Sequence, residues 1–475
     1  WATGILIKTL MESSPFQQRD VVTLFHEWIS APGLLFLVKR QVNVAKIFMT
    51  HATQLGRNIA MGEEDINKVI DRYLSQNETI PPQKAYQYHV EGTHQLEVEC
   101  AKHADLLITV SKAVARETKC ILGRKADIII PNGINLNTIA PKEKLQQKQQ
   151  TARKRINQFI EDYFYPFYYL NTENLHIINI SGRYEFHNKG IDVFLQSLKM
   201  VNESLNAQKV NTRTIVAFIW IPTAVSGIKE ETTLTMEISE QKRTILKNAK
   251  VKISKNFEKQ FRKNREYLTY KEVEYYFTPK QLRKLQALEE RMVKIGTEET
   301  PNPPITPFKI NKRDTIFQTL KQMGLENKET DSVKVIFYPI YLSKKDKLLA
   351  LDYYDAVAGC NLGVYPSIYE PFGLTPLEAL ALGVPAITTD LAGFGMYVSE
   401  RTSEEALGIH VLQRRNKTDY EAAQKLAEVI LRHSQLPRKK LSKARMIARE
   451  IAELYSWENI ITKYLDAFQK ALEKK

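Results

Sequence analysis

Cysteine and long apolar runs are scarce in this sequence, and each scarcity excludes a class of protein. Three cysteines occur in 475 residues: Cys100, Cys120 and Cys360. Their spacing suits neither a disulfide framework nor a metal site, so we expect buried, reduced thiols in a cytoplasmic protein. The sequence also contains no apolar run of about 18 residues or more, which excludes a membrane-spanning helix, and we expect no membrane partner.

The start of the chain lacks the marks of a targeting segment. Residues 1–14, WATGILIKTLMESS, carry neither a basic start nor a small-residue cleavage site, so they are not typical of a signal peptide. An initiating methionine is absent too. We expect the chain to begin within a helix, with earlier residues of the protein missing.

Acidic residues are fewer than basic ones, and much of the excess is local. The chain has 68 Lys and Arg against 54 Asp and Glu, a formal net charge of +14. Ten basic residues lie between Lys242 and Arg265, with Glu258 as the single acid among them. A polyanionic partner is one explanation of such charge. Because no nucleic-acid-binding motif accompanies the run, we do not expect a nucleic-acid partner.

The composition and patterning that are present indicate a large α/β protein. Apolar residues make up 43% and charged residues 26%, as in globular proteins, and 475 residues suggest two or three domains. Short apolar runs alternate with longer helical patterns. The runs are VVTLF, VAKIFMT, LLITVS and IIIPNG, then LHIINIS, TIVAFIWIP, VKVIFYP, LGVYPS and AITTD. One helical pattern places on a single face Ile191, Phe194, Leu195, Leu198 and Val201. This alternation predicts parallel sheets of the doubly wound type.

The two series of runs predict two Rossmann-like domains that face each other across a cleft. We place an N-terminal domain at residues 1–165 and a C-terminal domain at 166–436. A helical insert at 226–332 interrupts the second domain. The helices expected in residues 437–475 are predicted to pack back toward the N-terminal domain.

The insert begins with an amphipathic helix whose apolar stripe requires a partner. The stripe recurs every four residues and consists of Ile245, Ala249, Ile253, Phe257 and Phe261. Basic residues surround it, and PNPPITP at 301–307 is predicted to be a rigid turn or linker. Such an arm buries its stripe against its own fold or against another subunit, and the sequence leaves both open.

The most specific motif runs over residues 365–395, where a strand, a loop and a helix are predicted to follow one another. Thr375 is expected to cap this helix in a capping box with Glu378. The amides of the loop and first turn would then face a phosphate, and Gly373 allows close approach of the backbone. Glu370 and Glu378, eight residues apart, can accept hydrogen bonds from sugar and ribose hydroxyls. Taken alone, Glu378 is equally well explained as a capping residue.

This motif resembles the E-x7-E element of retaining glycosyltransferases of the GT-B fold, which pair two Rossmann-like domains. A second segment, SGRYEFHNKG from Ser181, narrows the resemblance to the eukaryotic-type glycogen synthase family. It puts Arg183 and Lys189 just after a predicted strand, where such a fold holds a diphosphate. Taken alone, Arg183 and Lys189 are also explained as two solvated surface charges without a ligand.

Two further segments agree with that family, and the resemblance covers nearly the whole chain. FHEW from Phe25 and FMTHATQLGRN from Phe48 resemble family elements of this form, and they bring His51 and Arg57 to a strand end that faces the cleft. The segment around Tyr353 resembles the family's helix whose tyrosine stacks on uracil. Alternatively, Tyr353 is an aromatic residue of the core. His51 likewise has the alternative of a structural histidine whose hydrogen bonds are made within the fold.

The sequence departs from the family in three places. The glycine-rich K-x-G-G loop that closes over the donor phosphates in the family has no counterpart, in keeping with missing N-terminal residues. Phe372 and Leu374 replace the family's usual Trp and Tyr. The arginine-rich helix that senses glucose 6-phosphate in the eukaryotic enzymes is matched only loosely, by basic residues between Arg438 and Arg449.

The resemblance implies transfer of glucose, with retention, from UDP-glucose to the non-reducing end of an α-1,4-glucan such as glycogen. It assigns catalysis to His51, Arg57, Arg183, Lys189 and Glu370. It assigns donor binding to Arg183, Lys189, Tyr353, Gly373, Leu374, Thr375 and Glu378. It implies that no metal or other cofactor is required, and that the protein is a homo-oligomer assembled through the insert.

Two other functions stay open at this point. One is another retaining GT-B transferase with a different donor or acceptor, and the choice between UDP and ADP as donor base belongs to it. The other is a non-catalytic, glucan-associated scaffold that keeps the fold. Binding of UDP separates the enzymes from the scaffold, because a scaffold need not bind it.

Overall fold

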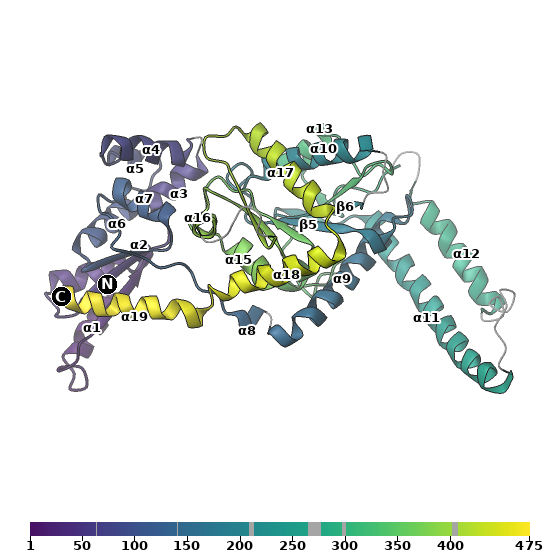
Figure 1. The fold of residues 1–475 in the computed structure, drawn as a ribbon, viewed down its shortest axis with the longest axis horizontal. Coiled ribbons are helices and arrows are strands. Elements are labelled where there is room, and N and C mark those ends of the chain that lie inside the picture. Colours follow the sequence, from purple (N-terminus) through teal and green to yellow (C-terminus); the bar gives the residue numbers. More distant parts are fainter. Residues whose placement is uncertain (63, 140, 209–212, 265–276, 297–300, 401–406) are drawn as a thin grey trace. The chain divides into compact units, whose positions relative to one another are not determined.

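The computed structural model describes residues 1–62, 64–139, 141–208, 213–264, 277–296, 301–400 and 407–475, with the backbone alone for 250–264 (Figure 1). Packing divides the chain into two compact units. The first comprises Trp1–Lys148, Ile178–Met200 and Cys360–Lys475, and the second comprises Gln149–Ile177 and Val201–Gly359. Helices and parallel strands occur in both, so the predicted α/β class is confirmed. The domain boundaries near residues 165 and 436 stay predictions.

The first unit contains a four-stranded parallel sheet in the order β1-β2-β3-β4. Its strands are β1 (Val22–His26), β2 (Ala45–Thr50), β3 (Leu106–Thr109) and β4 (Ile128–Ile129). The helices of this part are α1 (Ala2–Met11), α2 (Glu27–Lys39), α3 (Gln54–Met61), α4 (Ile66–Gln76), α5 (Gln83–Gln87), α6 (Glu91–His103), α7 (Lys112–Ile121) and α8 (Leu136–Ile139). Every residue of β3 is buried. Burial on both faces is the reason why such a strand is continuously apolar.

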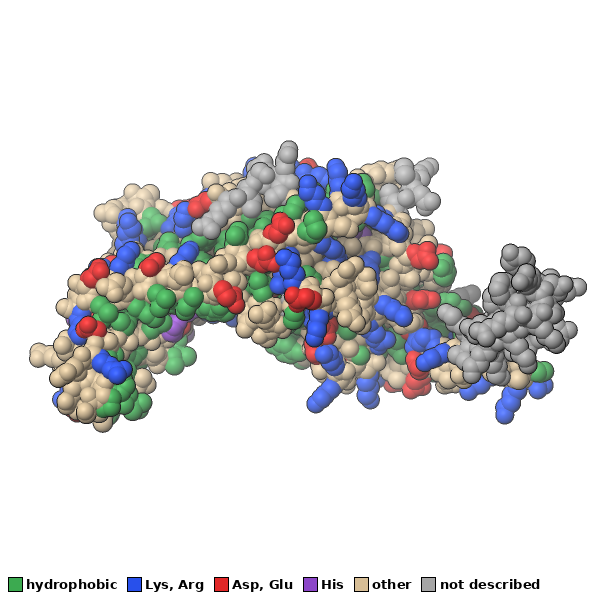
Figure 2. Space-filling view, turned by 60° about the horizontal axis from the view of Figure 1, so that its bottom comes forward, with side chains coloured by type: hydrophobic (Ala, Val, Ile, Leu, Met, Phe, Trp, Pro, Cys, Tyr) green, Lys and Arg blue, Asp and Glu red, His purple; other side chains and the backbone are tan. Residues whose placement is uncertain are grey.

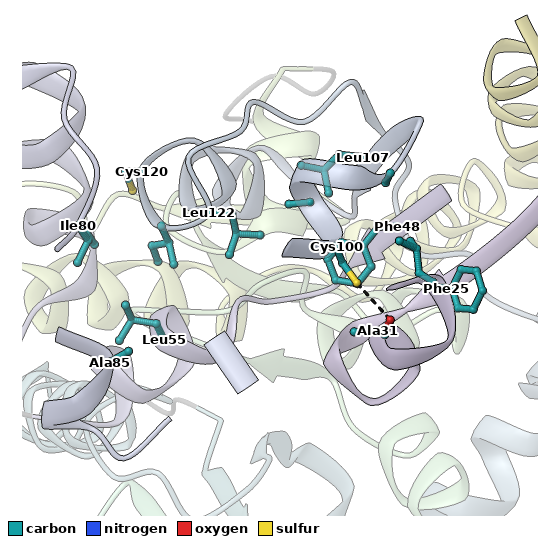
Figure 3. Close-up of a cluster of buried hydrophobic side chains, with 14 of the residues drawn as sticks. Phe25, Ala31, Phe48, Leu55, Ile80, Ala85, Cys100, Leu107, Cys120 and Leu122 are labelled. Atoms are coloured by element: carbon teal, nitrogen blue, oxygen red, sulfur yellow. Dashed lines mark hydrogen bonds between the residues drawn. The ribbon is translucent and has the colours of Figure 1, made fainter. Parts of the chain in front are cut away.

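The core of this part lies between the sheet and its helices (Figure 3). The rings of Phe25 and Phe48 come from β1 and β2, and the Cys100 thiol of α6 donates to the Ala31 carbonyl of α2 at 3.4 Å. All three cysteines are buried as thiols outside any disulfide, as predicted. Burial raises the pKa of the Cys100 and Cys120 thiols to about 12. These groups therefore stay protonated and act as small apolar side chains.

The first unit also holds four parallel strands of a second sheet, in the order β12-β11-β10-β5. They are β5 (His176–Ser181, whose first two residues belong to the second unit), β10 (Leu362–Val364), β11 (Ala386–Thr389) and β12 (Ile409–Leu412). The helices are α10 (Ile191–Gln208, whose residues from Val201 on belong to the second unit), α15 (Leu374–Ala381), α16 (Gly393–Ser399), α17 (Asp419–Ser434), α18 (Arg438–Glu453) and α19 (Trp457–Lys474). The apolar face predicted for α10 is confirmed, because Ile191, Phe194 and Leu195 are fully buried.

The last two helices pack on different parts of the first unit. Helix α18 contacts α15, and α19 contacts β1, β2 and β3; Figure 1 shows α19 in yellow beside the purple strands. The Tyr464 hydroxyl of α19 donates to Met49 Sδ of β2 at 3.6 Å. In α18 the guanidinium groups of Arg445 and Arg449 donate to backbone carbonyls of the second sheet's connections. These two arginines are therefore turned inward as structural donors.

The second unit continues from β5 in the order β5-β6-β9. Its strands are β6 (Ile215–Trp220) and β9 (Val333–Phe337), which pair in parallel, and β7 (Val225–Ile228) and β8 (Phe308–Ile310), which pair antiparallel. Its helices are α9 (Lys142–Phe164, which begins in the first unit), η1 (Thr172–Asn174), α11 (Glu230–Asn264), α12 (Pro279–Val293), α13 (Thr315–Gln322) and α14 (Tyr353–Ala358).

The insert is a helical hairpin of α11 and α12 (Figure 1). Ile245 of the predicted stripe is buried in a small core with Leu288 and Met292 of α12, and Ala249 is buried as well. For this part of the stripe the partner is the chain's own fold. The remaining stripe residues, 253, 257 and 261, lie outside the side chains that the structure describes.

Two surface properties bear on partners. Across the described parts of the chain, no helix is both long and apolar enough to cross a bilayer. On the face shown in Figure 2, Lys and Arg side chains are scattered among Asp and Glu. The described part of the basic run also makes local ion pairs, since Lys242 pairs with Glu289 and Arg243 pairs with Asp162.

Candidate active site

A pocket of about 240 Å³ lies in the first unit, where segments that follow strands of both sheets converge. His51 follows β2, Arg183 and Lys189 follow β5, and Glu370 follows β10. The carboxyl ends of parallel strands are where α/β proteins bind their ligands. The predicted site residues that line this pocket are His51, Arg57, Arg183, Lys189, Glu370, Gly373, Leu374 and Thr375. The structure thus brings eight predicted residues together, while their individual roles stay predictions.

The charged groups of the pocket are arranged in pairs. The Lys189 ammonium forms an ion pair with the Glu370 carboxylate, and these side chains are 15% and 21% exposed. Arg183 pairs with Glu185 at 2.8 Å and is 63% exposed. The first pair is shielded from solvent and is therefore screened less than the second. The Lys189–Glu370 pair is therefore the stronger of the two electrostatic interactions.

The helix at the pocket starts earlier than the sequence predicts. Helix α15 begins at Leu374, and its N-cap is Gly373, with φ 104° and ψ 77°, a conformation that favours glycine. A Cβ at Gly373 would lie 3.2 Å from Glu370 Cγ. The prediction that Thr375 caps this helix is therefore wrong, because Thr375 already belongs to its first turn. The amides of that turn remain available to an anion.

His51 is held by two residues from the junction of β1 and α2. His26 Nδ1 lies 3.0 Å from His51 Nε2, and the His51 backbone amide donates to Glu27 Oε1 at 2.7 Å. Burial, followed by the charge of Arg57, lowers the pKa of His51, and a hydrogen bond with Asn132 opposes them. Burial likewise lowers the pKa of His26. Both imidazoles are thus expected to be neutral near pH 7.

Three acids whose pKa values the charge of Arg57 lowers form a group that we call the carboxylate cage: Glu97 and Glu117 are fully buried, and Glu27 is half-buried. Each accepts a hydrogen bond from a backbone amide at the start of the α3 segment, at His51 (2.7 Å), Gln54 (2.9 Å) and Thr53 (3.1 Å) respectively. Burial raises the pKa of all three carboxyls, and Arg57 lowers it. The cage therefore fixes the segment that carries His51 and Arg57.

Two predicted residues do not line the pocket. Glu378 is half-buried on α15, and it is not one of the described residues that line the pocket. Tyr353 is the first residue of α14 in the second unit, where its ring centroid lies 5.5 Å from that of Tyr354. Their predicted contacts with ribose and uracil stay predictions.

A larger pocket of about 600 Å³ adjoins the first, and Asn188 and Tyr369 line both. His187, Asp192 and Asp419 nearby have potential metal-ligand atoms within 4.8 Å of one another. His187 pairs with Asp192 at 2.6 Å, and Arg414 pairs with Asp419. Each carboxylate of the group thus already has a cationic or histidine partner.

The carboxylate cage lies outside the site residues predicted from the sequence. Glu117 lies on the buried face of α7, where Val114 and Ile121 flank it at helical spacing. An acid inside an apolar helical stripe is rarely buried without a partner. That pattern, which can be seen in the sequence, is the signal that points to Glu117.

The arrangement of the strands and the pocket defines the class of protein. A solved structure of an alpha,alpha-trehalose 6-phosphate synthase from Burkholderia multivorans aligns with 98% of this chain and 75% of that chain, with a TM-score of 0.50 and 10% identity. At this low identity, the likeness shows a shared fold and nothing about activity. The fold is that of the GT-B glycosyltransferases.

Sequence comparisons narrow the class to one family. The family model described as glycogen synthase matches residues 3–475. A glycogen [starch] synthase of Dictyostelium discoideum is 31% identical over 100% of this chain and 52% of its own length. The liver glycogen [starch] synthase of Rattus norvegicus is 30% identical over 96% of this chain and 63% of its own length. The chain belongs to the glycogen synthase family, and it spans about half to two thirds of the length of these relatives.

Proposed function

We propose that this protein transfers glucose, with retention, from UDP-glucose to the non-reducing 4-hydroxyl of an α-1,4-glucan. The observation that carries the proposal is the convergence of Arg57, Arg183 and Lys189 with Glu370 in one pocket. Membership of the glycogen synthase family supports the nature of the product.

The three cations suit the departing UDP. Negative charge grows on the leaving diphosphate as its bond to glucose breaks, and fixed cations stabilise that charge most where water is excluded. Lys189 is mostly buried and Arg57 is partly buried, whereas Arg183 is exposed enough to move onto a ligand. We propose that these side chains supply the positive charge and that no metal cofactor is required.

Glu370 is proposed to orient the sugar. Once Lys189 turns to the diphosphate, the Glu370 carboxylate can accept hydrogen bonds from glucose hydroxyls. The amides at the start of α15 would face the phosphate, because Gly373 keeps the backbone open there. Glu378 and Tyr353 are proposed to bind ribose and uracil, as the resemblance implies.

Retention is proposed to occur by displacement on one face of the sugar. The bond between the anomeric carbon and the phosphate oxygen breaks, the acceptor 4-hydroxyl oxygen bonds to that carbon, and its proton passes to the departing phosphate oxygen. The described carboxylates that line the pocket, Glu185 and Glu370, are both ion-paired, which argues against either as a covalent nucleophile. A backbone carbonyl near the neutral His51 would stabilise charge at the anomeric carbon.

The decisive experiment measures incorporation of radiolabelled glucose into glycogen by the full-length protein. We expect incorporation from UDP-glucose and little from ADP-glucose. The reverse preference would make the protein a transferase with another donor. Failure with both donors, together with no heat of UDP binding in calorimetry, would favour a non-catalytic scaffold.

We also propose a cytoplasmic homo-oligomer that assembles through the α11–α12 hairpin. Buried thiols that form no disulfide suit a reducing compartment. Leu246 of α11 and Val293 of α12 are 47% and 62% exposed, and these apolar side chains are available to another subunit. The described part of the apolar stripe is covered by α12, so the stripe itself does not require that partner.

A further inference from the structure

The loop that carries Glu370 is inserted into the core of the first sheet. Tyr369 directly precedes Glu370, is 5% exposed, and belongs to the same buried cluster as Phe48, Leu55 and Ile59. The other described members of that cluster come from the first sheet and its helices. A residue next to the proposed sugar-binding carboxylate is thus part of a core built by another segment of the chain.

Helices of the first sheet also hold the backbone of this loop, residues 366–373, which we call the Glu370 loop. The side-chain amide of Asn67 in α4 donates from Nδ2 to the Ile368 carbonyl at 3.1 Å. The Ser111 hydroxyl at the start of α7 donates to the Pro371 carbonyl. The Tyr369 side chain lies between these two anchored carbonyls in the sequence, so its position is set from both sides.

Glu117 of α7 lies between the Glu370 loop and α3. It is fully buried, and its Oε2 accepts hydrogen bonds from the Thr53 amide at 3.1 Å and the Thr53 hydroxyl at 2.8 Å. Its other oxygen, Oε1, and the Tyr369 hydroxyl are both buried, and neither makes a hydrogen bond within the described part of the chain. Tyr369 packs in the same buried cluster as Cys120 and Ile121 of α7, the helix that carries Glu117. In keeping with this placement, Tyr369 lowers the pKa of Glu117, and Glu117, after burial, raises that of Tyr369. A small approach would satisfy both groups.

The contact with Thr53 reaches Arg57 through one turn of helix. Thr53 is the N-cap of α3, and its hydroxyl accepts from the Gly56 amide at 3.0 Å. Gly56 leaves the space that this arrangement needs, since a Cβ there would lie 2.6 Å from Glu117 Oε2. Arg57 is the next residue.

We propose that Glu117 is a positioning residue that couples α3, which carries Arg57, to the Glu370 loop through the Tyr369 hydroxyl. The consequence for the reaction rests on the proposed function: the coupling keeps Arg57 and Glu370 at fixed positions relative to each other around the reacting sugar. The coupling is made by a hydrogen bond from the Tyr369 hydroxyl to Glu117 Oε1, which a small movement of either side chain completes.

Glu97 provides a matched control within the same cage. It is equally buried, and it accepts a hydrogen bond from the neighbouring amide of α3, at Gln54. Its contact with α3 is thus of the same kind. Tyr369 of the Glu370 loop shifts the pKa of Glu117, whereas the groups that shift the pKa of Glu97, besides burial, are Gln54, Glu27, Glu117 and Arg57. A merely structural role predicts the same consequences for loss of either acid.

Amide hydrogen exchange of the ligand-free, full-length protein reads the coupling without any catalysis. Glu117→Ala should speed exchange roughly tenfold both in residues 51–61 and in the Glu370 loop. Glu97→Ala should speed exchange in residues 51–61 alone. Tyr369→Phe, which removes one oxygen and keeps the ring, should speed exchange in the Glu370 loop, whereas Glu117→Gln should change neither segment.

Steady-state kinetics then measures how loss of the coupling affects the reaction. Tyr369→Phe should lower kcat roughly tenfold and leave the KM for UDP-glucose nearly unchanged. If Glu117→Ala and Glu97→Ala give the same exchange pattern, the coupling is refuted. If Glu117→Ala does not fold, Tyr369→Phe decides, and an unchanged exchange rate in its Glu370 loop refutes the coupling. Absence of glucose transfer in the wild-type protein would overturn the proposed function instead, while the exchange result still decides the coupling.

Discussion

The Lys189 ammonium and the Glu370 carboxylate, 181 residues apart in the chain, form an ion pair inside the pocket. Each group is the other's counter-charge while the pocket holds no anion. Removing one of them therefore leaves a poorly solvated charge as well as a missing contact. This relationship determines how the charged residues of the site should respond to substitution.

Substitution of the phosphate-facing cations should abolish most of the activity. Lys189→Ala or Arg183→Ala is expected to lower turnover about 100-fold or more, the usual loss when one electrostatic stabiliser is removed. Lys344→Ala removes a surface cation that is 67% exposed and should leave turnover unchanged. Steady-state incorporation of glucose from UDP-glucose measures all three. Full activity in either pocket variant would exclude its proposed role.

The two glutamates of the E-x7-E element should affect different steps. Glu370→Gln is expected to reduce turnover with little change in UDP affinity, because its proposed contacts are with glucose. Glu378→Gln should weaken UDP binding by about 1–3 kcal/mol, the cost of a lost hydrogen bond to a charged group. Calorimetric titration of both variants with UDP tests this division. Equal losses of affinity would contradict it.

Gly56 should not tolerate a side chain, although it is a helical glycine. A Cβ at this position would lie 2.5 Å from Thr53 Oγ1 and 2.6 Å from Glu117 Oε2. We expect Gly56→Ala to reduce the free energy of unfolding by about 1–3 kcal/mol. Gly92→Ala in α6 is the control, because its Cβ would meet nothing within 4 Å and should stabilise the helix by about 0.5–1 kcal/mol. Urea denaturation that ranks the two variants in the opposite order would disprove the packing argument.

The buried Glu117 should make stability depend on pH. Burial, opposed mainly by the Thr53 hydrogen bonds, raises its pKa to about 7 from an ordinary value of 4.5. Between those pH values the folded protein keeps a proton that the unfolded chain has lost, so the free energy of unfolding falls as pH rises through this window. The charged or titratable groups coupled to this carboxyl are Arg57, Glu97, Cys120 and Tyr369.

Comparison with Glu117→Gln isolates this effect, because glutamine does not titrate. The variant should match the wild-type protein near pH 5 and exceed its stability near pH 8, by on the order of 2–3 kcal/mol. Thermal unfolding at the two pH values measures the change. A stability difference that does not vary with pH would mean that Glu117 is charged in the folded protein throughout.

The α11–α12 hairpin should be an assembly element. Leu246→Asp with Val293→Asp is expected to lower the mass of the particle in light scattering, because both exposed apolar side chains would become charged. Tyr420→Asp, at an exposed position of α17 outside the hairpin, should leave the mass unchanged. If the wild-type protein and the double variant have the same mass, the hairpin does not assemble subunits in this way.

Much of the fold and part of the pocket were predictable from local patterns. The continuous apolar runs predict the buried parallel strands, and the spacing from Ile191 to Leu198 predicts the buried face of α10. The residues that follow strands β5 and β10 lie together because the carboxyl ends of parallel strands share one edge of their sheet, whereas His51 and Arg57 reach the same pocket from β2 of the other sheet. That rule needs only the order of strands and helices along the chain.

The tertiary structure alone decided the contacts that depend on distant segments. No local pattern pairs Lys189 with Glu370 or puts Tyr369 into the core of the first sheet. The N-cap of α15 at Gly373, rather than at Thr375, likewise follows from a left-handed backbone conformation beside Glu370. Sequence periodicity records which face of an element is buried, whereas the partner of a buried group is fixed only when the whole chain has packed.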